Sequence, residues 1–384
     1  MNIFLVENTC ERRKFEVDKL KNDILHSQNI LIEDMNQADC IIFFSCGMKY
    51  DNTIQILNQI NTLSCQIIWY GCAVNMINNS CVNNFIKIPL NNYDLLLQYI
   101  NTDVLDNDDE VFEILNNYRF FTFEKALKKW DPRLFIPKCK DVYPLKISEG
   151  CSNDCSYCTI RNGIGPLKSR KIDEIVCEVK CAYEKNYTTF SLQCENSGSF
   201  GKDIGLNLGI LLLELKKLQL NLTIDLPDLY PSSFVDYLPE IESFLEDNSI
   251  FLIHLPLQSG SQFVLDKMHR HYSIDIVLSK LKYFVKKYPN IKVGTDIIFG
   301  FPGESDSEFK KTMGVLEKFN FQPLYIHGYC EQENTLSALI NDKVDEATKC
   351  WRIKQAYQLY PNCACYLNNY RGEKNENFDG ESSV

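Results

Sequence analysis

The first hundred residues alternate short apolar runs with amphipathic stretches. Apolar runs of strand length occupy 3–7, 41–45, 66–71 and 85–89, and helix-like segments occupy 12–25, 51–63 and 91–100. Continuous apolar runs of this length are typical of strands that are buried on both faces of a parallel sheet. The alternation predicts a small doubly wound α/β domain over residues 1–100.

A second, longer alternation of strand, loop and helix follows at 143–345. The expected strands are 143–147, 188–193, 222–227, 251–257, 292–299 and 323–329, and the expected helices are 172–185, 208–218, 232–245, 263–288 and 305–319. Six such units predict a partial (βα)6 barrel with a parallel sheet, open where an eight-stranded barrel would close.

Two segments fall outside these alternations. Residues 101–142 are first acidic, then aromatic and basic, and predict a linker with one helix. Residues 346–384 end in GEKNENFDGESSV and predict a short, partly disordered C-terminal tail.

Composition narrows the class of protein. A chain of 384 residues with 45% hydrophobic residues is long enough for two or three domains with their own cores. We find no apolar run that would span a membrane and no signal peptide, so we expect a cytoplasmic protein without a membrane partner. The net charge of −11 argues against a protein that grips nucleic acid by bulk electrostatics, but a local basic patch is compatible with it. Seventeen cysteines in such a chain favour metal ligation and buried thiols over a disulfide framework.

The clearest indication of function in the sequence is the cysteine-containing stretch LKISEGCSNDCSYC. Cys151, Cys155 and Cys158 follow a predicted strand in the spacing C-x3-C-x2-C. Three thiolates hold three irons of a [4Fe–4S] cluster and leave the fourth iron open. An open iron can take the amine and carboxylate of S-adenosylmethionine (SAM) and donate an electron that cleaves it to a 5′-deoxyadenosyl radical. The alternatives are a chance cluster in a cysteine-rich chain and a zinc site, for which only Cys177 follows within the next twenty residues as a fourth ligand.

A second set of cysteines predicts another metal site. Cys10, Cys46 and Cys72 each come just after a predicted strand of the N-terminal domain. Loops beyond the carboxyl ends of parallel strands converge on one crevice, so three thiolates from three loops can meet there. The alternative is that these cysteines are ordinary buried thiols.

Polar residues and glycines after the barrel strands are candidate SAM contacts. Gln193 and Glu195 are placed to hold the methionine amine, and the glycine turn GFPGE lets backbone approach an adenosine. Each of these residues is equally compatible with a turn that binds no ligand. The candidates are Tyr157, Gln193, Glu195, Gln258, Ser259, Gly300 and Gly303.

Two other groups of residues are not assigned to a site. Cys177 and Cys181 are four residues apart on one predicted helix, share a face and are expected to be core residues. His269 and His271 are not expected to be catalytic.

The chain resembles the radical SAM methylthiotransferases over roughly residues 1–340. The matching segments are SEGCSNDCSYC, KIDEIVCEV, ENSGSFGKDIGLNL, HLPLQSGSQFVLDKMHRHY and GTDIIFGFPGESDSEFKKT. The ENSGSFGKD segment is most similar to the archaeal and eukaryotic branch, which methylthiolates threonylcarbamoyl-adenosine in tRNA.

The resemblance implies two [4Fe–4S] clusters, the second held by Cys10, Cys46 and Cys72. It implies two molecules of SAM per turnover: one donates a methyl group to a sulfur on the N-terminal cluster, and the other yields the radical that removes hydrogen from an unactivated C–H. It also implies an electron donor such as flavodoxin or ferredoxin and a tRNA partner.

The chain departs from the family pattern where the family contacts its substrate. Gly163, Ile164 and Gly165 stand where the family has Ala-Arg-Gly, and the segment from Tyr329 to Thr335 lacks the family's arginine. We also expect no TRAM module, a small RNA-binding barrel, in the last forty residues. Three hypotheses remain open: a tRNA methylthiotransferase, a related enzyme acting on a peptide or protein side chain, and a catalytically silent iron–sulfur protein used for binding or sensing.

Overall fold

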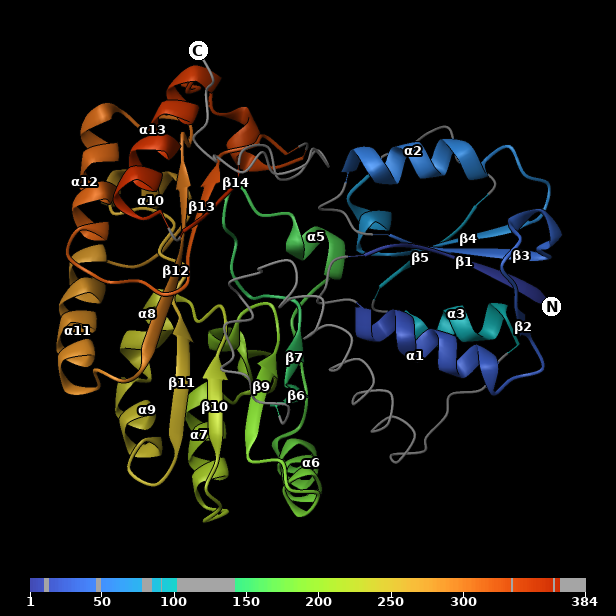
Figure 1. Ribbon diagram of the computed structural model, residues 1–384, viewed down its shortest axis with the longest axis horizontal. Coiled ribbons are helices and arrows are strands. Elements are labelled where there is room, and N and C mark those ends of the chain that lie inside the picture. Colours follow the sequence, from blue (N-terminus) through green and yellow to red (C-terminus); the bar gives the residue numbers. More distant parts are fainter. Residues whose placement is uncertain are drawn as a thin grey trace.

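The protein consists of two α/β units that lie side by side (Figure 1). The computed structural model describes residues 1–9, 14–45, 50–77, 85–90, 92–101, 142–332, 334–361 and 363–366. The expected α/β class, with a small N-terminal sheet followed by a partial parallel barrel, is confirmed. Most of the predicted linker, together with Cys10 and Cys46, lies outside the described residues.

The N-terminal unit is a five-stranded parallel sheet in the order β2-β1-β3-β4-β5. Helix α2 (Tyr50–Ile60) covers one face, and α1 (Lys14–Leu25) and α3 (Tyr93–Tyr99) cover the other (Figure 1). This doubly wound order places a topological switch point between β1 and β3, since the helices that follow these two strands lie on opposite faces of the sheet. The strands are β1 (Asn2–Asn8), β2 (Ile30–Leu31), β3 (Cys40–Ser45), β4 (Gln66–Gly71) and β5 (Ile86–Pro89).

Strand β3 explains why the apolar runs form a central sheet. Its side chains alternate between two cores: Ile42 and Phe44 pack with the α1 and α3 side, and Ile41 and Phe43 pack with α2. All four are almost completely buried because helices cover both faces of the sheet. The continuous apolar run is therefore the consequence of two-sided burial.

The C-terminal unit contains a seven-stranded parallel sheet in the order β14-β13-β12-β11-β10-β9-β6. In chain order, the first six strands begin and end within three residues of the predicted positions. Helices pack on its outer side, so that the carboxyl ends of the strands remain free to carry loops (Figure 1). The strands are β6 (Val142–Lys146), β9 (Thr189–Gln193), β10 (Thr223–Leu226), β11 (Ser249–His254), β12 (Lys292–Phe299), β13 (Leu324–Gly328) and β14 (Ala364–Tyr366).

Two expected long helices are each broken in two. The helix expected at 232–245 forms α8 (Pro231–Asp236) and α9 (Leu238–Phe244), because Pro239 starts a new helix in its first turn. The helix expected at 263–288 forms α10 (Gln262–Lys267) and α11 (Ile274–Lys287). The backbone of His269 between them has φ +54°, which no α-helix accommodates. The other barrel helices are α6 (Ile172–Glu184), α7 (Leu208–Lys216) and α12 (Asp306–Leu316).

The segment predicted to be a tail contributes two elements to the barrel. Helix α13 (Glu346–Leu359) buries Ile353 and Ala356 in the barrel core, and β14 pairs in parallel with β13. The structure therefore extends the sheet by one strand beyond the six that the alternation predicts. Residues 367–384, which carry the acidic end of the chain, lie outside the described part.

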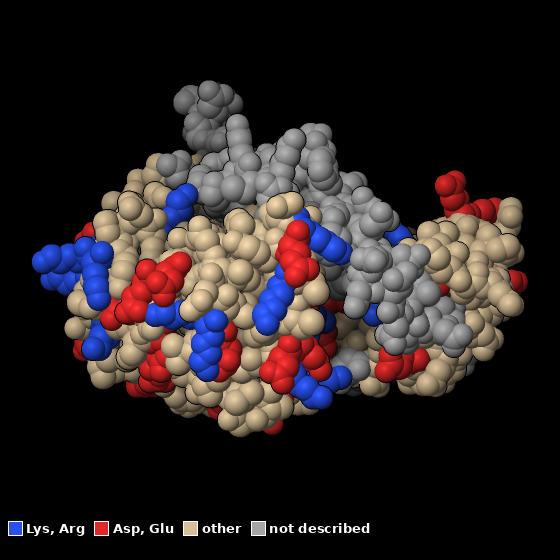
Figure 2. All heavy atoms as spheres, turned by 90° about the horizontal axis from the view of Figure 1, so that it is seen from below, with Lys and Arg blue, Asp and Glu red and all other residues tan. Residues whose placement is uncertain are grey.

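The face at the amino ends of the barrel strands carries basic and acidic side chains that are interspersed (Figure 2). Several of these are paired: Lys216 contacts Glu246, and Lys287 lies 2.8 Å from Glu242. Pairing of this kind leaves no extended surface of one sign on the described residues of this face. In the part of the chain that the structure describes, none of the helices combines the length and the apolar character needed to cross a lipid bilayer.

Candidate functional site

The loop that carries Cys151, Cys155 and Cys158 is closed at its base by a short antiparallel pair, β7 (Ser148–Glu149) with β8 (Lys168–Ser169). Gly150 has φ +74°, and a Cβ at this position would lie 2.6 Å from the carbonyl oxygen of Pro166. Only glycine fits such a backbone at such a close approach. The Gly150 amide also donates to Oε2 of Glu195 at 2.7 Å, which ties the loop to the end of β9.

Ser156, in the middle of the loop, fixes it to two other parts of the barrel. Its hydroxyl donates to the carbonyl of Lys267 at 2.8 Å and its amide to that of Met268 at 2.9 Å, both at the end of α10. Its carbonyl accepts from the amide of Ser337 at 2.9 Å, in the 3-10 helix η7 (Leu336–Leu339). Ser156 is buried, so these bonds are shielded from water and hold the three cysteines at one place.

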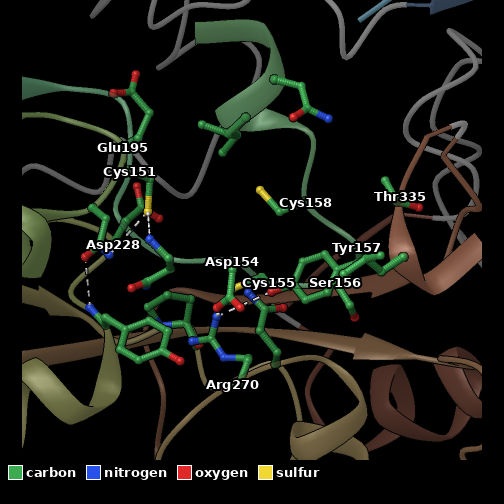
Figure 3. A pocket seen from close by; sticks show the side chains of 18 of the residues that line it. Cys151, Asp154, Cys155, Ser156, Tyr157, Cys158, Glu195, Asp228, Arg270 and Thr335 are labelled. Carbon is green, nitrogen blue, oxygen red and sulfur yellow. Dashed lines mark hydrogen bonds between the residues drawn. The ribbon is translucent and has the colours of Figure 1, made fainter. Parts of the chain in front are cut away.

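Hydrogen-bond donors surround the sulfur atoms (Figure 3). Cys151 Sγ accepts from the amide of Asn153 at 3.5 Å and from Nδ2 of Asn196 at 3.6 Å. Cys155 Sγ accepts from Nη1 of Arg270 at 3.7 Å. Donors aimed at sulfur stabilise thiolates and tune the potential of an iron–sulfur cluster. Three thiols, two of them with such donors, and no fourth cysteine among the described residues that line the cavity, fit a cluster with one open iron.

Burial keeps two of these thiols protonated when they are free. Burial, with a smaller contribution from the neighbouring Cys155 and Cys151, raises the pKa of Cys158 to about 12, although the backbone amide of Ile160 lowers it. Burial also raises the pKa of Cys155, although Arg270 lowers it. Metal binding to these thiols therefore displaces protons, as is general for cysteine ligands.

Arg270 is the functional residue that the sequence analysis missed. It is 4% exposed, lies between two histidines in sequence, and directs its guanidinium into the site (Figure 3). Nη1 lies 3.4 Å from the hydroxyl of Tyr157, and the guanidinium stacks 4.6 Å from the ring centre of Tyr230. A buried arginine beside a sulfur ligand supplies fixed positive charge. Of the flanking histidines, His269 is half-buried and His271 is exposed, and both lie near Asp154.

A cavity of about 310 Å³ opens beside the three cysteines, which is within the range of small-molecule sites. Of the candidate SAM contacts, Tyr157, Glu195 and Gln258 line it. Gln258 is 9% exposed and its Oε1 has no hydrogen-bond partner, so it can accept from a ligand donor.

The remaining candidates lie in the strand-end turns outside the cavity lining. The amide of Gln193 is near Ser191, and the hydroxyl of Ser259 contacts that of Thr312 at 3.1 Å. Gly300 and Gly303 have positive φ, and the Gly300 amide donates to Glu304. These contacts explain the conformation of the turns even when no ligand is bound. A role in SAM binding stays a prediction for Gln193, Ser259, Gly300 and Gly303.

A row of alternating carboxylates and imidazoles crosses the carboxyl ends of four barrel strands. His254 lies 3.3 Å from Asp228 and 3.2 Å from Asp296, and Asp296 lies 3.0 Å from His327. Asp228 and Asp296 also line the cavity. Although burial raises the pKa of Asp296, the charge of His254 and the hydrogen bond of His327 lower it below its ordinary value. Asp296 is therefore an ionised acceptor at the cavity wall.

Cys72 is the one cysteine of the predicted second site within the described residues. It is buried, begins the 3-10 helix η3 (Cys72–Asn75), and its Sγ lies 3.6 Å from the carbonyl oxygen of Ser45. The ends of three strands are aligned here, because Asn8 pairs with Ser45 and Ser45 pairs with Gly71. Cys72 follows the last of these strands directly.

Cys177 and Cys181 are exposed, so the expectation that they are core residues is wrong. The buried face of α6 is formed by Ile175, Val179 and Ala182. The two thiols share a face of the helix, but it is the face toward solvent.

Comparisons with known proteins agree with this geometry. Residues 145–316 match the Radical SAM superfamily. The chain is 27% identical to a probable threonylcarbamoyladenosine tRNA methylthiotransferase of Pyrococcus abyssi, over 88% of this chain and 79% of the relative. It is 26% identical to the ribosomal protein uS12 methylthiotransferase RimO of Natranaerobius thermophilus, over 94% of this chain and 82% of the relative. Among solved structures, the fold is similar to the cobalamin-dependent SAM radical enzyme OxsB, with a TM-score of 0.53 at 11% identity, covering 91% of this chain and 56% of that one.

Proposed function

The chain belongs to the radical SAM methylthiotransferases, and we propose that it inserts a methylthio group at an unactivated C–H of a tRNA nucleoside, namely a threonylcarbamoyl-modified adenosine. The proposed type of reaction is supported mainly by one observation: cysteines at the ends of strands in the two units lie close to each other. The Cys151–Cys158 loop and its cavity lie on one side of the short helix α5 (Ile160–Ile164), and Cys72 lies on the other. A transfer that combines radical formation with sulfur delivery requires such a pair of sites.

In this proposal Cys151, Cys155 and Cys158 hold a [4Fe–4S] cluster, and Cys10, Cys46 and Cys72 hold a second one. When bound, the first cluster and SAM supply an electron and the radical that removes a hydrogen atom. Asn196 and Arg270 donate to the cluster sulfurs, and Glu195 and Gln258 present acceptors to the SAM amine and hydroxyl groups. Ser156 keeps the loop in place, since its three bonds join it to α10 and η7.

The proposed substrate rests on the relatives and on the ENSGSFGKD segment. The Pyrococcus abyssi relative is named for threonylcarbamoyladenosine in tRNA. Glu195 and Asn196, the first two residues of this segment, line the cavity, and Asn196 and Ser199 contact Cys151 or its neighbour Ser152. The electron donor in this proposal is a flavodoxin or a ferredoxin.

A second candidate is a methylthiotransferase that acts on a peptide or protein side chain. The net charge of −11 favours it, because a polyanionic RNA is repelled by an acidic protein. The relative from Natranaerobius thermophilus is named for a ribosomal protein.

The two candidates separate in one assay. Reconstituted, reduced protein is incubated with SAM and either threonylcarbamoyl-modified tRNA or ribosomal protein, and nucleosides and peptides are analysed by mass spectrometry. A methylthio group on the nucleoside, formed at low salt and lost at high salt, supports the proposed function. A methylthio group on a peptide alone would replace it by the second candidate, and release of no 5′-deoxyadenosine would exclude both.

A further inference from the structure

Helix α5 contacts both halves of the molecule, although it has only five residues. It begins two residues after Cys158, and its Ile160 and Asn162 line the cavity. Its other side packs against η3, the turn that begins with Cys72. Figure 1 shows α5 between the barrel and the end of the N-terminal sheet, and Figure 3 shows this helix above the cysteine-lined cavity.

Gly163 is a point of close approach between the two halves. It is buried, and a Cβ added there would lie 2.5 Å from Sδ of Met76 and 2.9 Å from the carbonyl oxygen of Cys72. Real Cβ atoms do not approach other atoms so closely, and the second contact is with backbone. A side chain at this position must therefore push α5 and the turn that carries Cys72 apart.

Ile164, the next residue, anchors α5 in the N-terminal unit. It is partly buried against the apolar core of that unit, together with Ile86 and Tyr93. A second contact joins the units nearby, because Lys146 at the end of β6 lies 4.0 Å from Glu16 of α1. The cavity wall and the Cys72 turn are thus held by packing and not by a single polar contact.

We infer that Gly163 and Ile164 are positioning residues that set the separation of the two proposed clusters. This inference rests on the proposed function, in which hydrogen is removed on the barrel side and sulfur arrives from the Cys72 side. Product forms only when the same substrate carbon can be reached from the barrel side for hydrogen removal and from the Cys72 side for sulfur delivery. Misplacement of reacting groups by about 1 Å lowers a rate on the order of 10²-fold. Gly163 allows the contact, and Ile164 maintains it.

The matched test pair is Gly163→Ala and Gly314→Ala. Both glycines lie in helices, so both variants gain the same helix propensity, but a Cβ at Gly314 of α12 would meet nothing within 4 Å. Amide hydrogen exchange is measured on the anaerobically reconstituted full chain. We expect faster exchange of residues 72–77 by roughly tenfold in Gly163→Ala and no change in Gly314→Ala.

Turnover supplies the second readout. In Gly163→Ala the ratio of 5′-deoxyadenosine released to methylthio product is expected to rise by 10- to 100-fold or so, while 5′-deoxyadenosine formation itself continues. Met76→Ala added to Gly163→Ala is expected to restore part of the coupling, because it removes the contact with Sδ but not that with the Cys72 carbonyl.

The outcomes separate this inference from the proposed function. Unchanged exchange at 72–77, or an unchanged ratio in a wild-type enzyme that makes product, would overturn the positioning role. If the wild type makes no methylthio product on any substrate, the proposed function fails. Hydrogen exchange then decides alone whether Gly163 fixes the Cys72 turn.

Discussion

The guanidinium of Arg270 lies 3.7 Å from the sulfur of Cys155 at the cavity wall, where Arg270 is buried and Cys155 is half-buried. Arg270 reaches this place from the segment between α10 and α11, where the backbone leaves the helix at His269. It stacks on Tyr230 and donates to the carbonyl of Pro256, so its charge is held in one orientation. A fixed cation at a sulfur ligand favours the cluster state with one more electron.

Replacing Arg270 should therefore make the cluster harder to reduce. In Arg270→Gln we expect the midpoint potential to fall by about 60 mV, which is tenfold in the one-electron equilibrium. Arg270→Lys keeps the positive charge and is expected to shift the midpoint potential less. The measurement is a redox titration followed by EPR on anaerobic protein. Equal potentials in wild type and Arg270→Gln would contradict this role.

Arg352 should prove essential to the stability of the barrel. Its Nη1 lies 2.8 Å from Oε2 of Glu304, and the side chains are 3% and 0% exposed. Removing one partner of such a buried pair costs about 3–5 kcal/mol. Burial already raises the pKa of Glu304 to about 7 although Arg352 lowers it, so without Arg352 this carboxyl group is left buried without its partner and takes up a proton more readily. We expect the free energy of unfolding, measured by urea denaturation, to fall by this amount in Arg352→Met. The double variant Arg352→Met with Glu304→Gln should lose less. The exposed Lys354 of the same helix supplies the control, Lys354→Met, which should change stability little. A loss in Arg352→Met no larger than in this control would mean that α13 is not anchored by the pair.

Asp225 should give the fold a pH dependence of known sign. Burial raises its pKa from 3.8 to about 7, although Ser191 and the Leu192 amide donate to it. The folded state therefore holds a proton that the unfolded state has lost between these values, and stability falls as pH rises through this window. From about pH 5.5 to about pH 7, wild type should lose about 1.6 kcal/mol relative to Asp225→Asn, because the slope of about 1.4 kcal/mol per pH unit halves as the pH reaches the pKa of the folded state. The measurement is chemical denaturation of both proteins at the two pH values. If the free energy of unfolding changed equally with pH in wild type and in Asp225→Asn, this would contradict the raised pKa of Asp225.

The strands were predictable because their signal is local. Strands such as β3 and β12 are apolar runs that two-sided burial demands, and turns with glycine or polar residues follow them. The breaks in the two long helices could not be predicted in this way, because the apolar periodicity continues through Pro239 and His269. Strand β14 escaped prediction because it has only three residues.

The site was predictable only where the chemistry depends on spacing. The three cysteines of the loop are recognisable from C-x3-C-x2-C, and their neighbour Tyr157 follows from position. Arg270 gave no such signal, since its burial results from packing against Tyr230 and Tyr272, which are distant from the loop in sequence. The exposure of Cys177 likewise depends on which face of α6 meets the sheet.

The account depends above all on two clusters in one chain. The most direct test is the iron and sulfide content of anaerobically reconstituted protein, with Mössbauer spectra, for wild type and for a Cys10→Ala, Cys46→Ala, Cys72→Ala triple variant. We expect about eight irons in wild type and about four in the variant, each set in [4Fe–4S] form. About four irons in both proteins would contradict the account, because the N-terminal unit would then hold no cluster and could not deliver sulfur.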